Sequence, residues 1–151
     1  MLAQTSEIEE SVFPRVVCLL NTGGLEPHEF LFLRRISDGK WELPSGLVRC
    51  QEQVHGAMKR ILLATIGLES DLITLAFGYR GKFSAGSAVG RSHWRFFWLD
   101  ESNKPEIHLD PTLHNDSCWA TVSVALGLPL ADDLADCLLR NCREKPLIPP
   151  D

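Results

Sequence analysis

Glu52, Arg60 and the basic residues around them are the side chains of this sequence whose types and spacing suggest chemistry. A carboxylate and a guanidinium eight positions apart can form an ion pair or take part in acid–base catalysis. Between Arg34 and Arg95 the chain holds ten basic and five acidic residues, a net charge of +5 in a protein whose formal total is −5. A basic centre in an acidic chain favours the binding of an anion.

Five residues of this segment are candidates for holding a phosphorylated ligand. Guanidinium and ammonium groups bind phosphate oxygens directly, without a bridging cation, and an indole ring can stack on a base. The candidates are Arg34, Arg49, Lys59, Arg95 and Trp41. The alternative is that the basic side chains are ordinary solvated residues and that the tryptophan belongs to the core.

The stretch from Trp41 to Leu68 resembles the signature of the Nudix (MutT-like) hydrolase family, the box G-x5-E-x7-R-E-U-x-E-E-x-G-U, in which U is aliphatic. The matched box positions are Gly46, Glu52, Arg60, Leu62, Gly67 and Leu68, in register over 23 residues. The preceding W-x-L-P, the aromatic stretch 93–98 and Trp119, which we expect at the start of the final helical segment, resemble the family's flanking pattern. Over about residues 12–142, the resemblance implies an α/β/α sandwich with a mixed sheet, a central box helix and a C-terminal helix.

This chain differs from the family's box at the residues that carry out its chemistry. The resemblance implies cleavage of a nucleoside diphosphate linked to another group, with Mg²⁺ or Mn²⁺ held by box glutamates, because hard cations need anionic oxygen ligands. The three glutamates map onto Ile61, Ala64 and Thr65, which share one helix face and carry no carboxylate. We therefore predict no metal site and no cofactor. On this interpretation the protein has lost the pyrophosphohydrolase activity of the family but still binds a nucleoside-diphosphate-type ligand.

An active hydrolase with non-standard metal ligands is the first alternative. The acidic residues that could hold Mg²⁺ or Mn²⁺ in place of the box glutamates are Glu42, Glu69, Asp71, Asp110 and Asp116. In that case Glu52 would be the catalytic carboxylate and Arg60 its orienting partner.

A protein-interaction or homodimerisation module is the second alternative. A box helix with apolar residues on nearly every side is expected only when most of its sides are buried. Under this hypothesis Ile61 and Leu63 face outward, and the face formed by Ile61, Ala64 and Thr65 packs against another chain.

Hydrophobic periods predict the strands and helices that must position these residues. Short apolar runs predict strands over 15–20, 29–35, 72–79 and 93–99, of which the first two form a hairpin. Helical periods predict a helix over 52–66, ended by Gly67, and a second helix with Leu130, Leu134, Cys137, Leu138 and Cys142 on one face. The stretch 81–92, rich in Gly, Ser and Ala, is predicted as a loop, and a polar connection precedes the last helix.

Length and composition indicate one α/β domain. The chain has 151 residues, 44% hydrophobic and 23% charged, and we expect 11–143 to form the domain between tails at 1–10 and 144–151. The net charge argues against a general nucleic-acid binder. No apolar run reaches the roughly 18 residues of a membrane span, and the acidic N-terminus lacks the pattern of a secretory signal. We therefore expect a cytoplasmic protein.

Overall fold

The computed structural model describes residues 14–23, 27–85 and 88–143. Its elements, in chain order, are β1 (Arg15–Asn21), β2 (Phe30–Arg35), β3 (Trp41–Glu42), β4 (Ser45–Leu47), α2 (Val54–Ile66), β5 (Thr74–Ala85), β6 (Ala88–Asp100), β7 (His114–Ala120), α3 (Val122–Ala125), α4 (Leu134–Leu138) and the π-helical turn η1 (Leu139–Arg143). The expected tails 1–10 and 144–151 lie outside the described residues.

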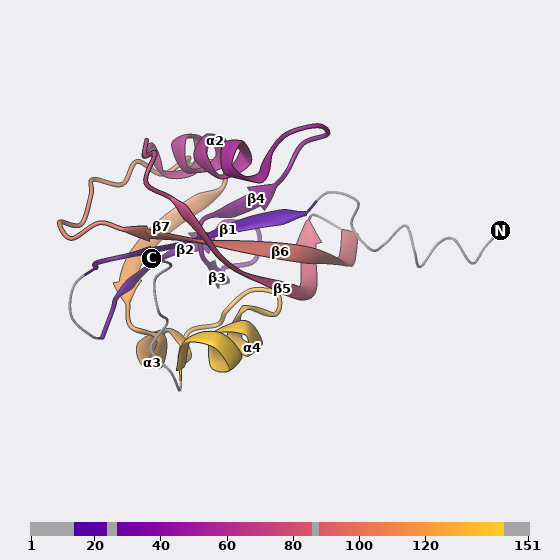
Figure 1. Ribbon diagram of the computed structural model, residues 1–151. Helices are drawn as coiled ribbons and strands as arrows, with labels where there is room; N and C mark the ends of the chain where they lie inside the picture. The colour runs from indigo at the N-terminus through magenta and orange to yellow at the C-terminus, as the bar shows by residue number, and fades with distance from the viewer. Residues whose placement is uncertain (1–13, 24–26, 86–87, 144–151) are drawn as a thin grey trace.

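A mixed sheet lies between two helical layers (Figure 1). The strand order is β3-β2-β1-β6-β5, while β4 also pairs with β1 and β7 with β2. β1 runs parallel to β6, and the other strand pairs are antiparallel. α2 covers one face of the sheet, and α3 and α4 lie against the other. The predicted α/β/α sandwich with a mixed sheet is confirmed.

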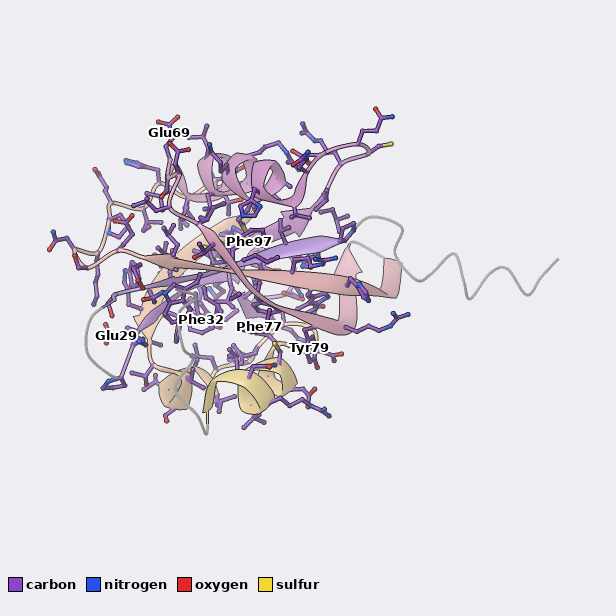
Figure 2. All side chains as sticks on the ribbon, in the orientation of Figure 1. Glu29, Phe32, Glu69, Phe77, Tyr79 and Phe97 are labelled. Carbon is purple, nitrogen blue, oxygen red and sulfur yellow. The ribbon has the colours of Figure 1, made fainter. Side chains whose placement is uncertain are left out.

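The alternation of side chains along β6 supplies a hydrophobic core to each face of the sheet. Phe96 and Trp98 belong to the cluster on the α3–α4 side, whereas Phe97 belongs to the cluster beneath α2. Figure 2 shows Phe97 toward α2 and Phe77 toward α4. Each buried aromatic side chain contributes about 1.5–3 kcal/mol, so both helical layers are fixed by the same strand.

The box helix forms where its period predicts it. Its buried face consists of Ala57, Met58, Ile61, Leu62, Thr65 and Ile66. Gly67 ends the helix in the left-handed conformation with φ 71°, and its N–H donates to the carbonyl of Leu63 at 3.0 Å. A residue without a Cβ adopts this conformation at little cost, so the predicted end of the helix is confirmed.

The predicted loop over 81–92 is wrong, because β5 extends to Ala85 and β6 begins at Ala88. Cross-strand pairs continue along the hairpin, from Arg80 opposite His93 to Ala85 opposite Ala88. Gly, Ser and Ala have low strand propensity, but pairing with a neighbouring strand overrides such local preferences.

The polar connection before the last helix contains a strand that the pattern does not predict. β7 pairs antiparallel with β2, and Trp119 lies in it opposite Leu31. The expectation that Trp119 begins a helical segment is therefore wrong. The sequence of β7 has no apolar alternation, and its conformation is set by hydrogen bonds to a distant strand.

The structure differs in detail from the predicted first hairpin and the predicted C-terminal helix. β1 and β2 are antiparallel with Asn21 opposite Phe30, but β1 pairs at greater length with β6. The expected C-terminal helix is a short α4 followed by η1, and Leu130 lies before it in a bridge with Trp41. In the described part of the chain, no helix is both long and apolar enough to cross a bilayer.

Candidate functional site

Glu52 and Arg60 tie the box loop to the box helix. Arg60 donates from Nε to Glu52 Oε2 at 2.8 Å and from Nη2 to Oε1 at 2.9 Å, and Nη2 also donates to the carbonyl of Leu47. The backbone N–H of Arg49 donates to Glu52 Oε1 at 2.9 Å. The Arg60 hydrogen bonds, together with that N–H, lower the pKa of Glu52 from 4.5 to about 2. Both carboxylate oxygens are thus engaged in shaping the loop, as the ion-pair hypothesis predicts.

Two of the three residues on the box-helix face formed by Ile61, Ala64 and Thr65 are packed within this chain. Ile61 and Thr65 are each only 5% exposed, and Ala64 is exposed. A Cβ atom built on Gly46 would lie 2.7 Å from Cδ1 of Ile61, so this side chain covers the loop glycine directly. The expectation that Ile61 faces outward, toward a partner, is therefore wrong, whereas Leu63 is half exposed.

A polar cavity of about 470 Å³ opens beside this face, and we call it the box pocket. Ser45 and Thr65 contribute hydroxyl groups from the box loop and the box helix. The remaining lining residues come from β1, from β2 and the turn after it, from β3, and from the start of β7 with its preceding loop: Arg15, Arg35, Ile36, Ser37, Asp38, Glu42, Thr112, Leu113 and His114.

Glu42 is the centre of a buried ion-pair cluster in the box pocket. Its Oε1 lies 3.6 Å from Arg15 Nη2 and 3.5 Å from Arg35 Nη1, and its Oε2 lies 2.7 Å from Nε2 of His114. The four side chains are between 5% and 12% exposed. Buried charges are tolerated when they are paired and hydrogen-bonded, so the ion pairs and hydrogen bonds within the cluster compensate for its burial.

Two further carboxylates complete the ion pairs of Arg35. Asp38 lies 2.6 Å from Arg35 Nη2, and Asp132, from the segment before α4, lies 3.4 Å from Nη1. Burial alone would lower the pKa of Arg35, but the Asp38 hydrogen bond and the charges of Glu42 and Asp132 raise it overall. Burial also lowers the pKa of Arg15, against the opposing effects of Glu42 and Asp132.

His114 carries one buried nitrogen whose hydrogen-bonding capacity is unused. Its Nδ1 has no hydrogen-bond partner among the described residues, although the side chain is only 5% exposed. Buried polar atoms are nearly always satisfied in folded proteins, so this nitrogen is unusual. The pocket thus combines paired guanidinium groups with several hydroxyls.

The NUDIX domain family model matches residues 13–144. The chain belongs to the Nudix family. Its fold is also that of solved Nudix structures. The MutT protein of Methanosarcina mazei Go1 is 22% identical with a TM-score of 0.70, covering 88% of this chain and 94% of that one. The Nudix domain of Shewanella oneidensis NrtR, solved with ADP-ribose, is 20% identical with a TM-score of 0.67, covering 87% and 86%. A search of curated proteins gave no match.

Nudix proteins generally use divalent metals, but the box residues of this Nudix chain do not fit one. Ile61, Ala64 and Thr65 offer one hydroxyl and no carboxylate, and the packing of Ile61 on Gly46 fills the adjoining space. Across the described residues, no three His, Cys, Asp or Glu side chains lie close enough together to hold a metal ion.

The acidic residues considered as replacement ligands are spread over this Nudix domain. Glu42 is paired within the cluster, and Asp110 accepts hydrogen bonds from Thr112. Asp116 lies 4.0 Å from Arg34. The two remaining residues, Glu69 and Asp71, line a groove beyond the end of α2.

The five predicted ligand residues do not share one site. Arg34 lies over the ring of Trp41, 5.7 Å from its centroid, and donates to Asn115. Lys59 pairs with Asp71, Arg49 is exposed in the box loop, and Arg95 lies on β6 beside a separate cavity. The structure therefore brings together only Arg34 and Trp41.

The sequence pattern gives no indication of Arg15 and His114, which line the box pocket of this Nudix domain. Arg15 begins β1 and His114 begins β7, and the two are 99 positions apart. Neither residue belongs to a motif. The sequence hints at the box pocket in one respect: Glu42 and Arg35, which precede the box, carry opposite charges and could form an ion pair.

Proposed function

We propose that this Nudix chain is a binding protein that does not catalyse metal-dependent pyrophosphate hydrolysis and that binds a nucleoside-diphosphate-type ligand in the box pocket. The replacement of the box carboxylates by Ile61, Ala64 and Thr65 carries the proposal, because the bound cation stabilises transition-state charge by several kcal/mol. Ile61 is buried against Gly46, so the site has been repacked around its new residues.

The box pocket suits a small polar ligand. Its volume of about 470 Å³ lies within the range of ligand sites, roughly 300–1,000 Å³. Arg15 and Arg35 are balanced by carboxylates, so phosphate oxygens would be bound by oriented N–H and O–H groups rather than by excess charge. ADP-ribose, the ligand in the NrtR structure, belongs to the proposed ligand class.

Titration calorimetry in EDTA tests the binding proposal. We expect heat with ADP-ribose or ADP in the absence of any divalent cation, and a two- to tenfold weaker affinity for Thr65→Val, since a hydrogen bond contributes about 0.5–1.5 kcal/mol. Thr74→Val, an exposed threonine on β5, is the matched control and is expected to leave the affinity unchanged. Absence of heat with all nucleotides would contradict the proposal.

A phosphate-release assay tests the loss of activity. With nucleoside diphosphate and dinucleotide substrates and either Mg²⁺ or Mn²⁺, we expect no turnover above that of Glu52→Gln. Turnover clearly above this control would support instead the active hydrolase with displaced ligands, and Glu52 and Arg60 would then be examined as its catalytic pair.

The interaction hypothesis retains support from one surface. Leu63 is 50% exposed and Leu72 is 75% exposed, and both line a groove with Lys59. A homodimer that covers these side chains would be detected by sedimentation and weakened by Leu63→Lys. We also propose that the protein is cytoplasmic.

A further inference from the structure

A groove of about 720 Å³ lies between the exposed side of α2 and the loop that follows this helix, and we call it the outer groove. α2 contributes Lys59, Arg60 and Leu63, the loop contributes residues 69–72, and Glu101 follows the end of β6. Figure 2 shows Glu69 beside α2, pointing away from the sheet. None of these residues lines the box pocket, so the outer groove is a separate surface.

Two leucines give the outer groove an exposed apolar surface. Leu63 is 50% exposed and Leu72 is 75% exposed, although Leu62 and Ile73 beside them in the sequence are buried. The turn that carries Leu72 is ordered, since its N–H donates to Ser70 Oγ at 3.0 Å. Transfer of such apolar surface from water to a partner is favourable, so the two leucines are candidates for a contact with another molecule.

The charges around the leucines leave a negative surplus. Lys59 pairs with Asp71, and Arg60 pairs with Glu52. The carboxylates of Glu69 and Glu101 have no ion pair within the part of the chain that the structure describes. Because both cations of the groove are already compensated, a complementary partner is one that brings positive charge to Glu69 and Glu101.

The chain itself does not supply that positive charge. A two-fold contact between two copies would place each outer groove against its own counterpart, so carboxylates would face carboxylates. The ends of the sequence are acidic as well. Residues 1–13 contain three Glu and no Lys or Arg, and residues 144–151 contain two acidic residues and one Lys. The charge of the groove therefore favours a different protein as its partner.

We propose that the outer groove docks an amphipathic helix of another protein, with apolar residues on one face and Lys or Arg beside them. The described walls of the groove are a helix and a loop, whereas β-strand addition needs a free sheet edge. Apolar residues one turn apart on the docked helix would cover Leu63 and Leu72, and the flanking cations would pair with Glu69 and Glu101. This docking does not depend on ligand binding in the box pocket.

Fluorescence anisotropy with a labelled synthetic peptide tests this proposal. The probe is an amphipathic helical peptide of leucine and lysine, with leucines at i, i+3, i+4 and i+7. We expect it to bind, and the same peptide with glutamate for every lysine to bind about tenfold more weakly or worse. Leu63→Ser and Leu72→Ser should each weaken binding about fivefold or more, because they remove apolar surface from the contact. Glu69→Gln and Glu101→Gln should each weaken it about two- to fivefold, and these losses should shrink at high salt.

Val124→Ser and Glu106→Gln are the matched controls, because they change an exposed apolar residue of α3 and an exposed carboxylate outside the groove. We expect both to bind the lysine peptide like the unmodified protein, with circular dichroism confirming that every variant is folded. Equal losses in the controls would show that the peptide responds to net charge alone and would overturn the proposal. Equal binding of the two peptides, or full binding by the Leu63→Ser/Leu72→Ser double variant, would overturn it as well. So would a dimer in sedimentation that Leu63→Lys dissociates, because the occupant would then be a second copy.

Discussion

Both carboxylate oxygens of Glu52 accept hydrogen bonds, from the guanidinium of Arg60 and from the backbone N–H of Arg49. The same guanidinium reaches the carbonyl of Leu47, so one pair of side chains joins both ends of the box loop. None of these contacts needs a metal. This explains how two residues of a catalytic signature serve a structural purpose in a chain without the metal-binding carboxylates.

At low pH the contribution of Glu52 is expected to disappear. Its pKa is lowered from 4.5 to about 2 in the folded protein, so its ionised form stabilises the fold above about pH 4.5, and the stabilisation is lost as the pH falls toward 2. The melting temperature of Glu52→Gln should therefore be lower than that of the unmodified protein at pH 6, and the gap should narrow between pH 4.5 and 2. Circular dichroism melts across this range measure the effect.

Glu69→Gln is the control for this pH series, because it removes an exposed carboxylate outside the box loop. We expect it to show no comparable gap at pH 6. A gap for Glu52→Gln that stays constant down to pH 2 would show that the ion pair does not account for its stability effect.

At the scale of elements, the packing of α2 on the box loop distinguishes this domain from one that holds a metal. Ile61 is in the hydrophobic cluster beneath α2 and also covers Gly46. The helix is thus fixed by apolar contacts at a position where the family box has a carboxylate. A glutamate in place of Ile61 would have to be buried or would force the loop to move.

A double-mutant cycle between Gly46 and Ile61 tests this packing. Gly46→Ala would place a methyl group 2.7 Å from Cδ1 of Ile61, and we expect it to destabilise the fold by about 1–3 kcal/mol. Ile61→Val removes Cδ1 and alone costs about 0.5–1.5 kcal/mol. Because Val relieves the closest contact, the double variant should be more stable than the sum predicts by at least about 0.5 kcal/mol, as measured by urea denaturation. Strict additivity would show that the two side chains do not meet.

At the scale of the whole molecule, charge is divided between two places with different chemistry. The box pocket encloses an ion-pair cluster in which basic and acidic groups compensate each other, whereas the segment between Asp71 and Asp100 contains no Asp or Glu. The net charge of −5 describes neither place.

Thermal denaturation with and without divalent cations examines the whole domain. A ligand bound only by the folded state at a hundred times its Kd stabilises that state by about 2.7 kcal/mol. We expect Mg²⁺ and Mn²⁺ to leave the melting temperature unchanged relative to EDTA at equal ionic strength, since the box residues do not fit these ions. A saturating increase with Mn²⁺ concentration would reveal a metal site and favour the hydrolase hypothesis.

The sequence alone determined the features that depend on neighbours along the chain. The period of α2, its end at Gly67 and the Glu52–Arg60 pair depend on residues within about two helical turns or one loop, so their pattern was sufficient. The identities of Ile61, Ala64 and Thr65, and with them the loss of the box carboxylates, were equally readable. The sandwich followed from the order of strands and helices and from the family resemblance.

Only the tertiary structure decided what depends on pairing between distant segments. Arg15, Glu42 and His114 meet because the start of β1, the end of β3 and the start of β7 lie at the same place, and no spacing in the sequence records that meeting. Arg80 of β5 and Arg95 of β6 share one face because the register of the hairpin is fixed by hydrogen bonds between strands. A shift of one residue would have sent those of one strand to the opposite face, since side chains alternate with a period of two.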